Sequence, residues 1–465
     1  MRKRKNYVLY LLLMAVFVLS SCSKSSPNAK FIPEDAVVVS IDVKQIFEKS
    51  KLGDNEDAKK ELLKAIKENT DSKRRKDLLQ AIVENPAKAG IDLREPIFFF
   101  TDKEQNNALV GSVLDKNDFS ELLSTLTEEK VKEKEGLMYL EDGRNVIVFD
   151  DATFYFSEDR ELNDIVKLFK NDDTQNTMAE NDDFAKLLGG NGLVKMLVPL
   201  SAYGKYADAA VKKNLPDGAR LEDLSILMNL NSGKGNITMS VEVLAKSDAW
   251  KDSFKKSADI CEKIDGDYLK YLKKGALLLY TNIDGEELYE TLVERKVFKE
   301  IGAEGAQDMV KKVLNSIDGD CVINVGELNL RSPEFTAYIK TKDGSLIDLA
   351  EEFGMTSRGG IDFGFKDGTS YVAMGDDAFK EAKNTYDKSA IKGHRFYFYC
   401  DAELAGNFSD LPYSYRRSAR ELSQYLSAIE VYDTGTTSCD FVLKLKNEDK
   451  DALEFLGELI LENIN

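Results

Sequence analysis

The segment ITMSVEVLAKSDAWKDSF (237–254) contains the pattern that decides the fold. Ile237, Met239, Val241 and Val243 alternate with polar residues, which predicts a strand with one dry face and one wet face. A polar turn and an amphipathic helical pattern follow. Three further segments have the same order of strand, turn and helix: 108–126, 335–353 and 440–460.

A second type of segment alternates with the first. It is an apolar strand that runs into a polar or acidic residue and then a helix, as in VVVSIDVKQIFEK (37–49), and it also occurs at 193–206, 276–292 and 395–406. Between the two types lie a helical stretch and one more strand, at 96–102, 224–231, 321–328 and 428–434. The chain therefore predicts four units, each with the order strand, helix, strand, strand, helix.

These units predict an α+β fold. We expect mostly antiparallel sheets with helices on one face, a ferredoxin-like plan, in two duplicated halves at 31–265 and 266–465. Two hairpins interrupt the pattern, with Asp142-Gly143 and Asp367-Gly368 at their turns, because Asp-Gly supplies the positive φ of a tight hairpin. The alternative is convergent patterning without duplication, since the units share few identical residues.

The N-terminus has the features of a bacterial lipoprotein signal peptide (1–21). Four basic residues, Arg2 to Lys5, precede 13 consecutive apolar residues (7–19), fewer than the roughly 20 that a membrane-spanning helix needs. Leu19-Ser20-Ser21-Cys22 follows and resembles a lipobox, which implies a thioether-linked lipid on Cys22 and cleavage just before it. An ordinary signal peptide or an uncleaved anchor is the alternative.

The mature chain would be strongly acidic. The 465 residues contain 64 Lys and Arg against 82 Asp and Glu, and loss of residues 1–21 leaves 60 basic residues and a net charge of −22. Residues 22–30 predict a lipidated polar tether, because Ser, Pro and Asn do not build a core. An acidic chain disfavours a nucleic-acid partner, and the lipid must supply the contact with the membrane.

Candidate catalytic groups are sparse. His394 is the single histidine, and we expect a structural or solvent-facing role for it. We interpret the acidic pairs at 150–151, 172–173, 182–183 and 376–377 as surface residues, with a weak Ca²⁺ site or a carboxylate-based glycosidase as alternatives. Trp250 predicts core packing with Phe254, and the segment 413–422 predicts a solvated helix face. No cofactor and no metal site are predicted.

Four cysteines besides Cys22 predict free, buried thiols. In a ferredoxin-like unit, the strands of Cys400 and Cys439 would lie parallel and adjacent, with the two cysteines offset by five residues, or roughly 17 Å. That distance is too long for a disulfide. The sequence alone leaves the disulfide state of Cys261, Cys321, Cys400 and Cys439 open, because four cysteines allow three pairings.

The lipobox followed by FIPEDAVVVSIDVKQIF (31–47) resembles a family of uncharacterised lipoproteins of Bacteroidota, whose body is classed as a domain of unknown function. The resemblance implies a Gram-negative envelope and brings no catalytic residues. The stretch SKSSPNAK (23–30) has no acidic residue of the kind that sorts such lipoproteins to the cell surface, which favours a periplasm-facing position.

Together these features predict an exported, lipid-anchored envelope protein, in the outer membrane, that binds a partner or supports the envelope without catalysis. The possible partners are an envelope protein or a glycan. The alternatives are a carboxylate-based glycan hydrolase, which needs two facing carboxyl groups, and a glycan-binding module, which needs an exposed aromatic strip.

Overall fold

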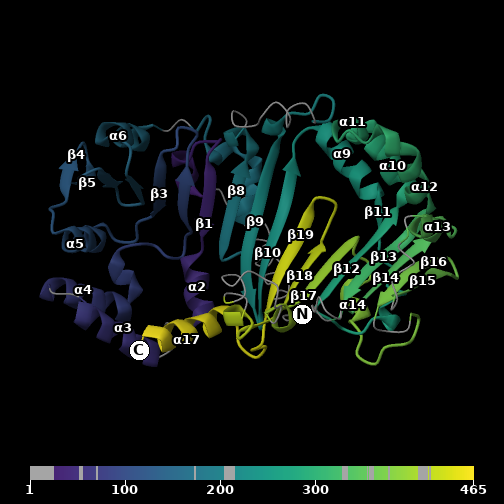
Figure 1. The fold of residues 1–465 in the computed structure, drawn as a ribbon. Coiled ribbons are helices and arrows are strands. Elements are labelled where there is room, and N and C mark those ends of the chain that lie inside the picture. Colours follow the sequence, from purple (N-terminus) through teal and green to yellow (C-terminus); the bar gives the residue numbers. More distant parts are fainter. Residues whose placement is uncertain are drawn as a thin grey trace, which may run out of the picture. The chain divides into compact units, whose positions relative to one another are not determined.

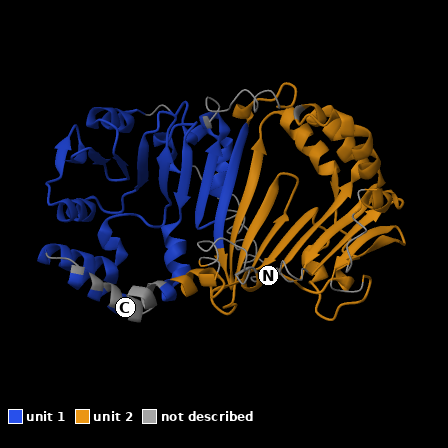
Figure 2. Cartoon of the chain, viewed as in Figure 1, with its two compact units in different colours: residues 1–205, 224–231, 457–465 blue, residues 206–223, 232–456 orange. Residues whose placement is uncertain are grey.

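The computed structural model describes residues 26–51, 56–69, 72–171, 174–203, 215–326, 334–352, 354, 361–374, 378–406, 417 and 420–464. Two compact units are present (Figure 2). The first contains the described residues of Met1–Lys205, Leu224–Asn231 and Gly457–Asn465, and the second those of Tyr206–Asp223 and Ser232–Leu456. The predicted boundary between two halves near residue 266 stays a prediction.

The first unit contains one broad antiparallel sheet (Figure 1). Its strands pair in the order β9-β8-β1-β2-β3-β7-β6-β5-β4. The strands are β1 (Val37–Ile41), β2 (Ile97–Thr101), β3 (Asn107–Ser112), β4 (Lys132–Lys134), β5 (Leu137–Asp142), β6 (Asn145–Phe149), β7 (Thr153–Ser157), β8 (Val194–Pro199) and β9 (Leu224–Gly233). The helices are α2 (Val43–Ser50), α3 (Glu56–Asn69), α4 (Lys73–Glu84), α5 (Lys116–Thr127), α6 (Leu162–Lys170) and α7 (Asp182–Gly189).

The second unit contains a sheet of the same kind. Its strands pair in the order β10-β19-β18-β17-β12-β13-β14-β16-β15, and the short β11 pairs with the end of β12. The strands are β10 (Asn236–Ala245), β11 (Cys261–Glu262), β12 (Leu277–Asp284), β13 (Ile317–Val325), β14 (Phe335–Thr341), β15 (Ile361–Lys366), β16 (Thr369–Met374), β17 (Phe396–Asp401), β18 (Leu426–Asp433) and β19 (Ser438–Leu445).

The helices of the second unit lie in the connections between its strands. They are α9 (Asp248–Asp259), α10 (Gly285–Glu294), α11 (Val297–Glu300), α12 (Gln307–Ser316), α13 (Ser345–Glu352), α14 (Lys388–Ile391) and α15 (Ala402–Gly406), and α17 (Ala452–Ile464) begins in this unit. In Figure 1, α9, α10 and α12 gather at one end of the strands. No helix in the described part of the chain is long and apolar enough to cross a membrane.

The predicted ferredoxin-like plan is wrong. Strands that were expected to close separate small sheets pair with each other: Val38 of β1 lies opposite Leu197 of β8, and Leu279 of β12 lies opposite Phe398 of β17. Each of these pairings is antiparallel. Because an unpaired strand edge leaves a row of backbone donors and acceptors unsatisfied, joining the edges extends each sheet.

Acidic residues end strands and begin helices, as the local pattern predicts. Asp42 follows β1 and accepts a hydrogen bond from Gln45 N of α2 at 2.9 Å. Asp284 and Asp401 cap α10 and α15 in the same way after β12 and β17. A carboxylate at this position satisfies backbone N–H groups that have no partner within the helix.

The predicted tether differs from the structure in its second part. Ser26 accepts a hydrogen bond from Asn28 N and begins the short 3₁₀ helix η1 (Pro27–Phe31), in which Asn28 is fully buried. The side chain of Asn28 donates to Ser112 Oγ at 3.0 Å and accepts from Thr153 Oγ1 at 3.0 Å. Ser26 and η1 are therefore part of the folded body, while Cys22 and the predicted signal peptide lie outside the described residues.

Candidate binding surface

A row of apolar side chains crosses the whole sheet of the second unit. Residues that lie directly opposite each other in neighbouring strands share one face of a sheet. The registers connect nine such residues from β10 to β15: Met239, Phe441, Val431, Phe398, Leu279, Ile323, Ala337, Val372 and Phe363.

A second row lies beside the first on the same face, two residues along each strand. It contains nine more residues: Ile237, Leu443, Ile429, Cys400, Leu277, Val325, Phe335, Met374 and Ile361. We call these two rows the apolar face. At a strand spacing of about 4.8 Å and a residue repeat of about 3.4 Å, it measures roughly 38 Å by 7 Å between Cα positions.

None of these eighteen side chains is buried. Ile323 is 45% exposed and Phe441 37% exposed, and the other sixteen are partly buried. The opposite face of the same sheet is a tyrosine-rich core in which Tyr280, Tyr338 and Tyr397 are buried. Since proteins rarely expose contiguous apolar patches larger than a few hundred Å², the apolar face is the strongest candidate for a binding surface.

All four cysteines of the body lie on the side of the apolar face. Cys400 belongs to its second row, Cys321 and Cys439 lie opposite Thr281 and Asp433, and Cys261 lies opposite Ile283. Burial raises the pKa of the Cys321 thiol to about 12, with a further contribution from the charge of Asp320. Burial also raises the pKa of Cys400 and Cys439. The thiols of Cys321, Cys400 and Cys439 therefore stay protonated at neutral pH and add soft apolar surface.

The predicted arrangement of Cys400 and Cys439 is wrong. Their strands, β17 and β19, are separated by β18, and both pair with it in antiparallel register. The four body cysteines are free in the structure, and they are half-buried rather than buried.

A polar groove of about 720 Å³ includes Cys261, which lies opposite Ile283, four residues along β12 from Leu279 of the apolar face. It lies between α9 and α10, and its lining carries both signs of charge. The basic side chains are Lys256, Lys263 and Arg395, and the acidic ones are Asp259, Glu262, Asp284, Glu287, Glu290 and Glu294.

Two buried carboxylates are used by structural hydrogen bonds. In the second unit, Asp320 accepts from Tyr280 Oη at 2.7 Å, from Asn282 Nδ2 at 3.1 Å and from the backbone N of Asp265 and Gly266. Burial beside this carboxylate raises the pKa of Tyr280. The donors hold the loop before η6 (Leu269–Tyr271) onto the sheet.

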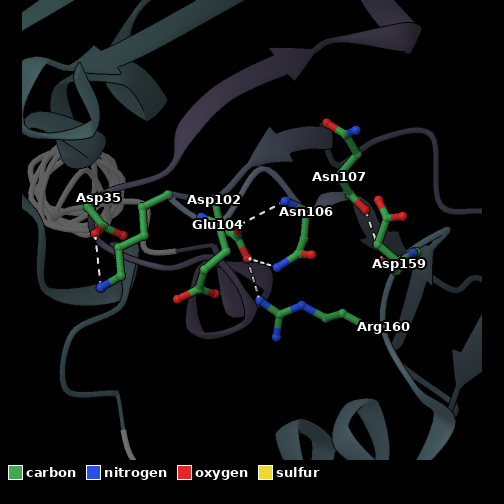
Figure 3. Close-up of polar contacts among 9 residues, drawn as sticks. Asp35, Asp102, Glu104, Asn106, Asn107, Asp159 and Arg160 are labelled. Atoms are coloured by element: carbon green, nitrogen blue, oxygen red, sulfur yellow. Dashed lines mark hydrogen bonds and ion pairs between the residues drawn. The ribbon is translucent and has the colours of Figure 1, made fainter. Parts of the chain in front are cut away.

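In the first unit, Asp102 plays the corresponding part (Figure 3). It is 4% exposed and accepts from Arg160 at 2.8 Å, from Asn106 Nδ2 at 2.9 Å and from two backbone N–H groups of the β2–β3 loop. Burial alone would raise the pKa of Asp102, but the bonds from Asn106 and Arg160 outweigh it and lower that pKa. Nearby, burial raises the pKa of Tyr155 to about 12.

This environment gives no support to the hydrolase alternative. A glycosidase needs one carboxyl group whose pKa is raised, facing a second one. Where the pKa of a described carboxyl group is clearly shifted, it is lowered: by an arginine at Asp92 and Asp223, and by lysine or serine hydrogen bonds at other positions. Within the described ranges, no three His, Cys, Asp or Glu side chains come together as metal ligands.

The acidic pairs of the sequence act in local structure where the structure describes them. Asp150 accepts from the backbone N of Ala152 and Thr153, and Asp151 pairs with Lys116 at 2.6 Å. Asp183 is buried and accepts from Ser225 Oγ at 2.8 Å. The pairs 172–173 and 376–377 lie outside the described residues, as does most of 413–422.

The two ring residues singled out by the sequence are also structural. Nδ1 of His394 lies 2.7 Å from the carbonyl oxygen of Asp433, to which it donates, at the end of β18. Trp250 is half-buried, stacks on Phe254 with 5.5 Å between ring centroids and donates from Nε1 to the carbonyl of Arg220. Neither ring lies in the apolar face.

Sequence reasoning missed the apolar face. The signal was present, because β12 (LLLYTNID) and β17 (FYFYCD) are apolar or aromatic at both odd and even positions. Such strands read as buried on both faces, and only the registers show which face stays uncovered.

The chain belongs to a family of unknown function, DUF4836. The family model matches residues 29–411. No curated protein matches the chain. Among solved structures, it is similar to crystal form I of TP0453, with 14% identity and a TM-score of 0.26, over 47% of this chain and 79% of that one. So low a score carries no argument about fold or function.

Proposed function

We infer that this chain is a lipid-anchored protein of the bacterial cell envelope that acts by binding an apolar partner. The apolar face is the observation that carries the binding role: eighteen apolar side chains over nine strands, none of them buried. The carboxylates of Asp102 and Asp320 accept structural hydrogen bonds, and the raised pKa of Cys321 keeps its thiol protonated. Both features support binding rather than catalysis.

The anchor rests on the sequence. The basic start, the short apolar run and Leu19-Ser20-Ser21-Cys22 favour a lipid on Cys22. A mature charge of −22 gives no attraction to anionic lipid surfaces, so acyl chains would hold the protein at the membrane. The acid-free stretch after Cys22 favours the periplasmic side of the outer membrane.

Labelled palmitate tests the anchor. The wild type should incorporate the label and fractionate with membranes, and Cys22→Ala should do neither. Incorporation into the Cys22→Ala variant, or none into the wild type, would refute the anchor.

Nile red, a neutral dye that fluoresces on apolar surfaces, tests the binding role. We expect Ile323→Asp in the centre of the apolar face to reduce dye binding, because a carboxylate resists desolvation. Ile301→Asp is the matched control, since Ile301 is 69% exposed in the turn after α11. Equal dye binding by the wild type and both variants would contradict a role for this face.

A further inference from the structure

We propose that the occupant of the apolar face is the hydrocarbon of lipid acyl chains. This inference rests on the proposed binding role and names its ligand class. Three properties of the apolar face support it: few hydrogen-bonding groups, no basic side chains, and a length greater than that of one acyl tail.

The face offers almost no hydrogen-bonding groups. Seventeen of its side chains are hydrocarbon or thioether, and the exception is the thiol of Cys400, whose pKa is raised by burial. From β19 to β16, each strand is paired with a neighbour on both sides, so its backbone groups are used in ladders. Protein interfaces form about one hydrogen bond per 100–200 Å². A surface that supplies none suits a ligand that requires none, such as an alkyl chain.

The charge of the chain disfavours a second copy as the occupant. Two mature chains of −22 repel each other, and the apolar face has no basic side chain to offset that repulsion. An alkyl chain carries no charge and meets no such cost.

The shape of the face also suits flexible hydrocarbon. Met239 lies on the outermost strand β10 and Met374 on β16, next to the outermost strand β15, among leucine, isoleucine and phenylalanine side chains of different lengths. Methionine adapts to varied apolar partners. One acyl tail spans about 15 Å, half of a bilayer core of about 30 Å. A row of roughly 38 Å therefore has length for more than one tail.

The polar groove at Cys261 gives the ligand's other end a suitable environment. Lys256, Lys263 and Arg395 lie there together with acidic side chains, so a solvated headgroup would meet both charges. The inference concerns the tails and leaves the headgroup unspecified.

Binding of a fluorescent C16 fatty acid to the full mature chain tests this inference. Both the wild type and Ile301→Asp should bind it, whereas Ile323→Asp should bind about tenfold more weakly, the cost of placing a carboxylate against hydrocarbon. In parallel, lysophosphatidylethanolamine micelles should slow the alkylation of Cys400 by N-ethylmaleimide in the wild type. Circular dichroism would show whether Ile323→Asp is folded, and Phe441→Ser provides a milder second variant.

The outcomes separate the two proposals. Tight fatty-acid binding that Ile323→Asp and Phe441→Ser both weaken, with protection of Cys400, supports acyl chains. No binding of the fatty acid by a wild type that still binds Nile red on this face would overturn the acyl inference and leave the apolar binding role intact. A wild type that binds neither the fatty acid nor Nile red on this face would refute the apolar binding role as well.

Discussion

The two sheets differ in how far a helix buries one of their faces. In the first unit, α5 packs across β3, β6 and β7, where Phe119 meets Phe149 at 4.9 Å and Phe154 at 5.2 Å between ring centroids. Phe119 and Leu123 are buried there. In the second unit, α9 and α13 follow β10 and β14 in the same chain order, but neither has a buried residue. The helix after each alternating strand thus decides whether a sheet face becomes core or surface.

The sequences of these helices explain the difference. α5 (KNDFSELLSTLT) presents Phe119 and Leu123 four residues apart, on one side of the helix. In α9 (DAWKDSFKKSAD), the two large rings, Trp250 and Phe254, stack on each other. In the described part of the second unit, neither ring is buried, and the side chains of the apolar face are not buried either.

The largest difference in stability should appear when one phenylalanine ring is removed from the core under α5 and one from the apolar face. Phe119→Ala should lower the free energy of unfolding of the first unit by about 3–5 kcal/mol, because it opens a cavity in a packed core. Phe441→Ala should cost only about 1–2 kcal/mol, because Phe441 is 37% exposed and so only partly removed from water. Urea denaturation followed by hydrogen exchange would separate the two units. A cost at Phe441 equal to that at Phe119 would show that the apolar face is packed core.

The thiols give the next largest effect. A pKa of about 12 for Cys321 leaves ~10³-fold less thiolate than an ordinary thiol near 8.5. Cys321 of the native chain should therefore react with N-ethylmaleimide at pH 8 about a thousandfold more slowly than in the urea-unfolded chain. Peptide mass spectrometry measures both rates. Native and unfolded rates within tenfold of each other would contradict this environment.

The buried ion pair of the first unit predicts a dependence on pH. The folded pKa of Asp102 is lowered, so its contribution to stability is complete above the unfolded value near 4 and is lost as the pH falls through the folded value. Asp102→Asn should cost about 1–3 kcal/mol at pH 7 and progressively less below pH 4. Denaturation at pH 7, 4 and 3 would check this. A mutant penalty that does not change with pH would refute the assignment.

The smallest loss of stability should come from replacing a hairpin glycine, and it should be equal in the two units. Gly143 and Gly368 both have positive φ in hairpin turns, at 64° and 74°, so alanine at either position should cost about 1 kcal/mol. Gly189→Ala at the end of α7, where no side chain would be obstructed, is the control and should change stability by under about 0.5 kcal/mol. Thermal denaturation suffices. Unequal costs at the two turns would show that one hairpin relaxes.

The sequence predicted local structure better than pairing. The apolar stretch 96–102 became β2, and the turn Asp367-Gly368 has positive φ at both residues, as expected. In the other hairpin, Asp142 pairs with Asn145, so the turn is Gly143-Arg144, one residue later than expected. Period-two patterns define a strand and its faces but do not identify its neighbour. The pairing of β1 with β8 joins residues more than 150 positions apart and has no local signal.

The candidate surface was harder to predict for the same reason. Leu279 and Tyr280 are adjacent apolar residues in one strand, yet Tyr280 is buried and Leu279 is not. Only the tertiary position of η6 and α14 over the tyrosine side decides between them. The hydrogen bonds of Asn28 were likewise invisible, because Ser112 and Thr153 lie about a hundred residues away in sequence.

Asn28 also limits how far the body can stand from a membrane. From Cys22 to Ser26, the chain covers four residues, at most ~14 Å when fully extended. If Cys22 carries the lipid, the fold cannot reach across the periplasm to a distant target. It would work within a molecular diameter of the bilayer to which it is attached, where hydrocarbon is the most abundant apolar material.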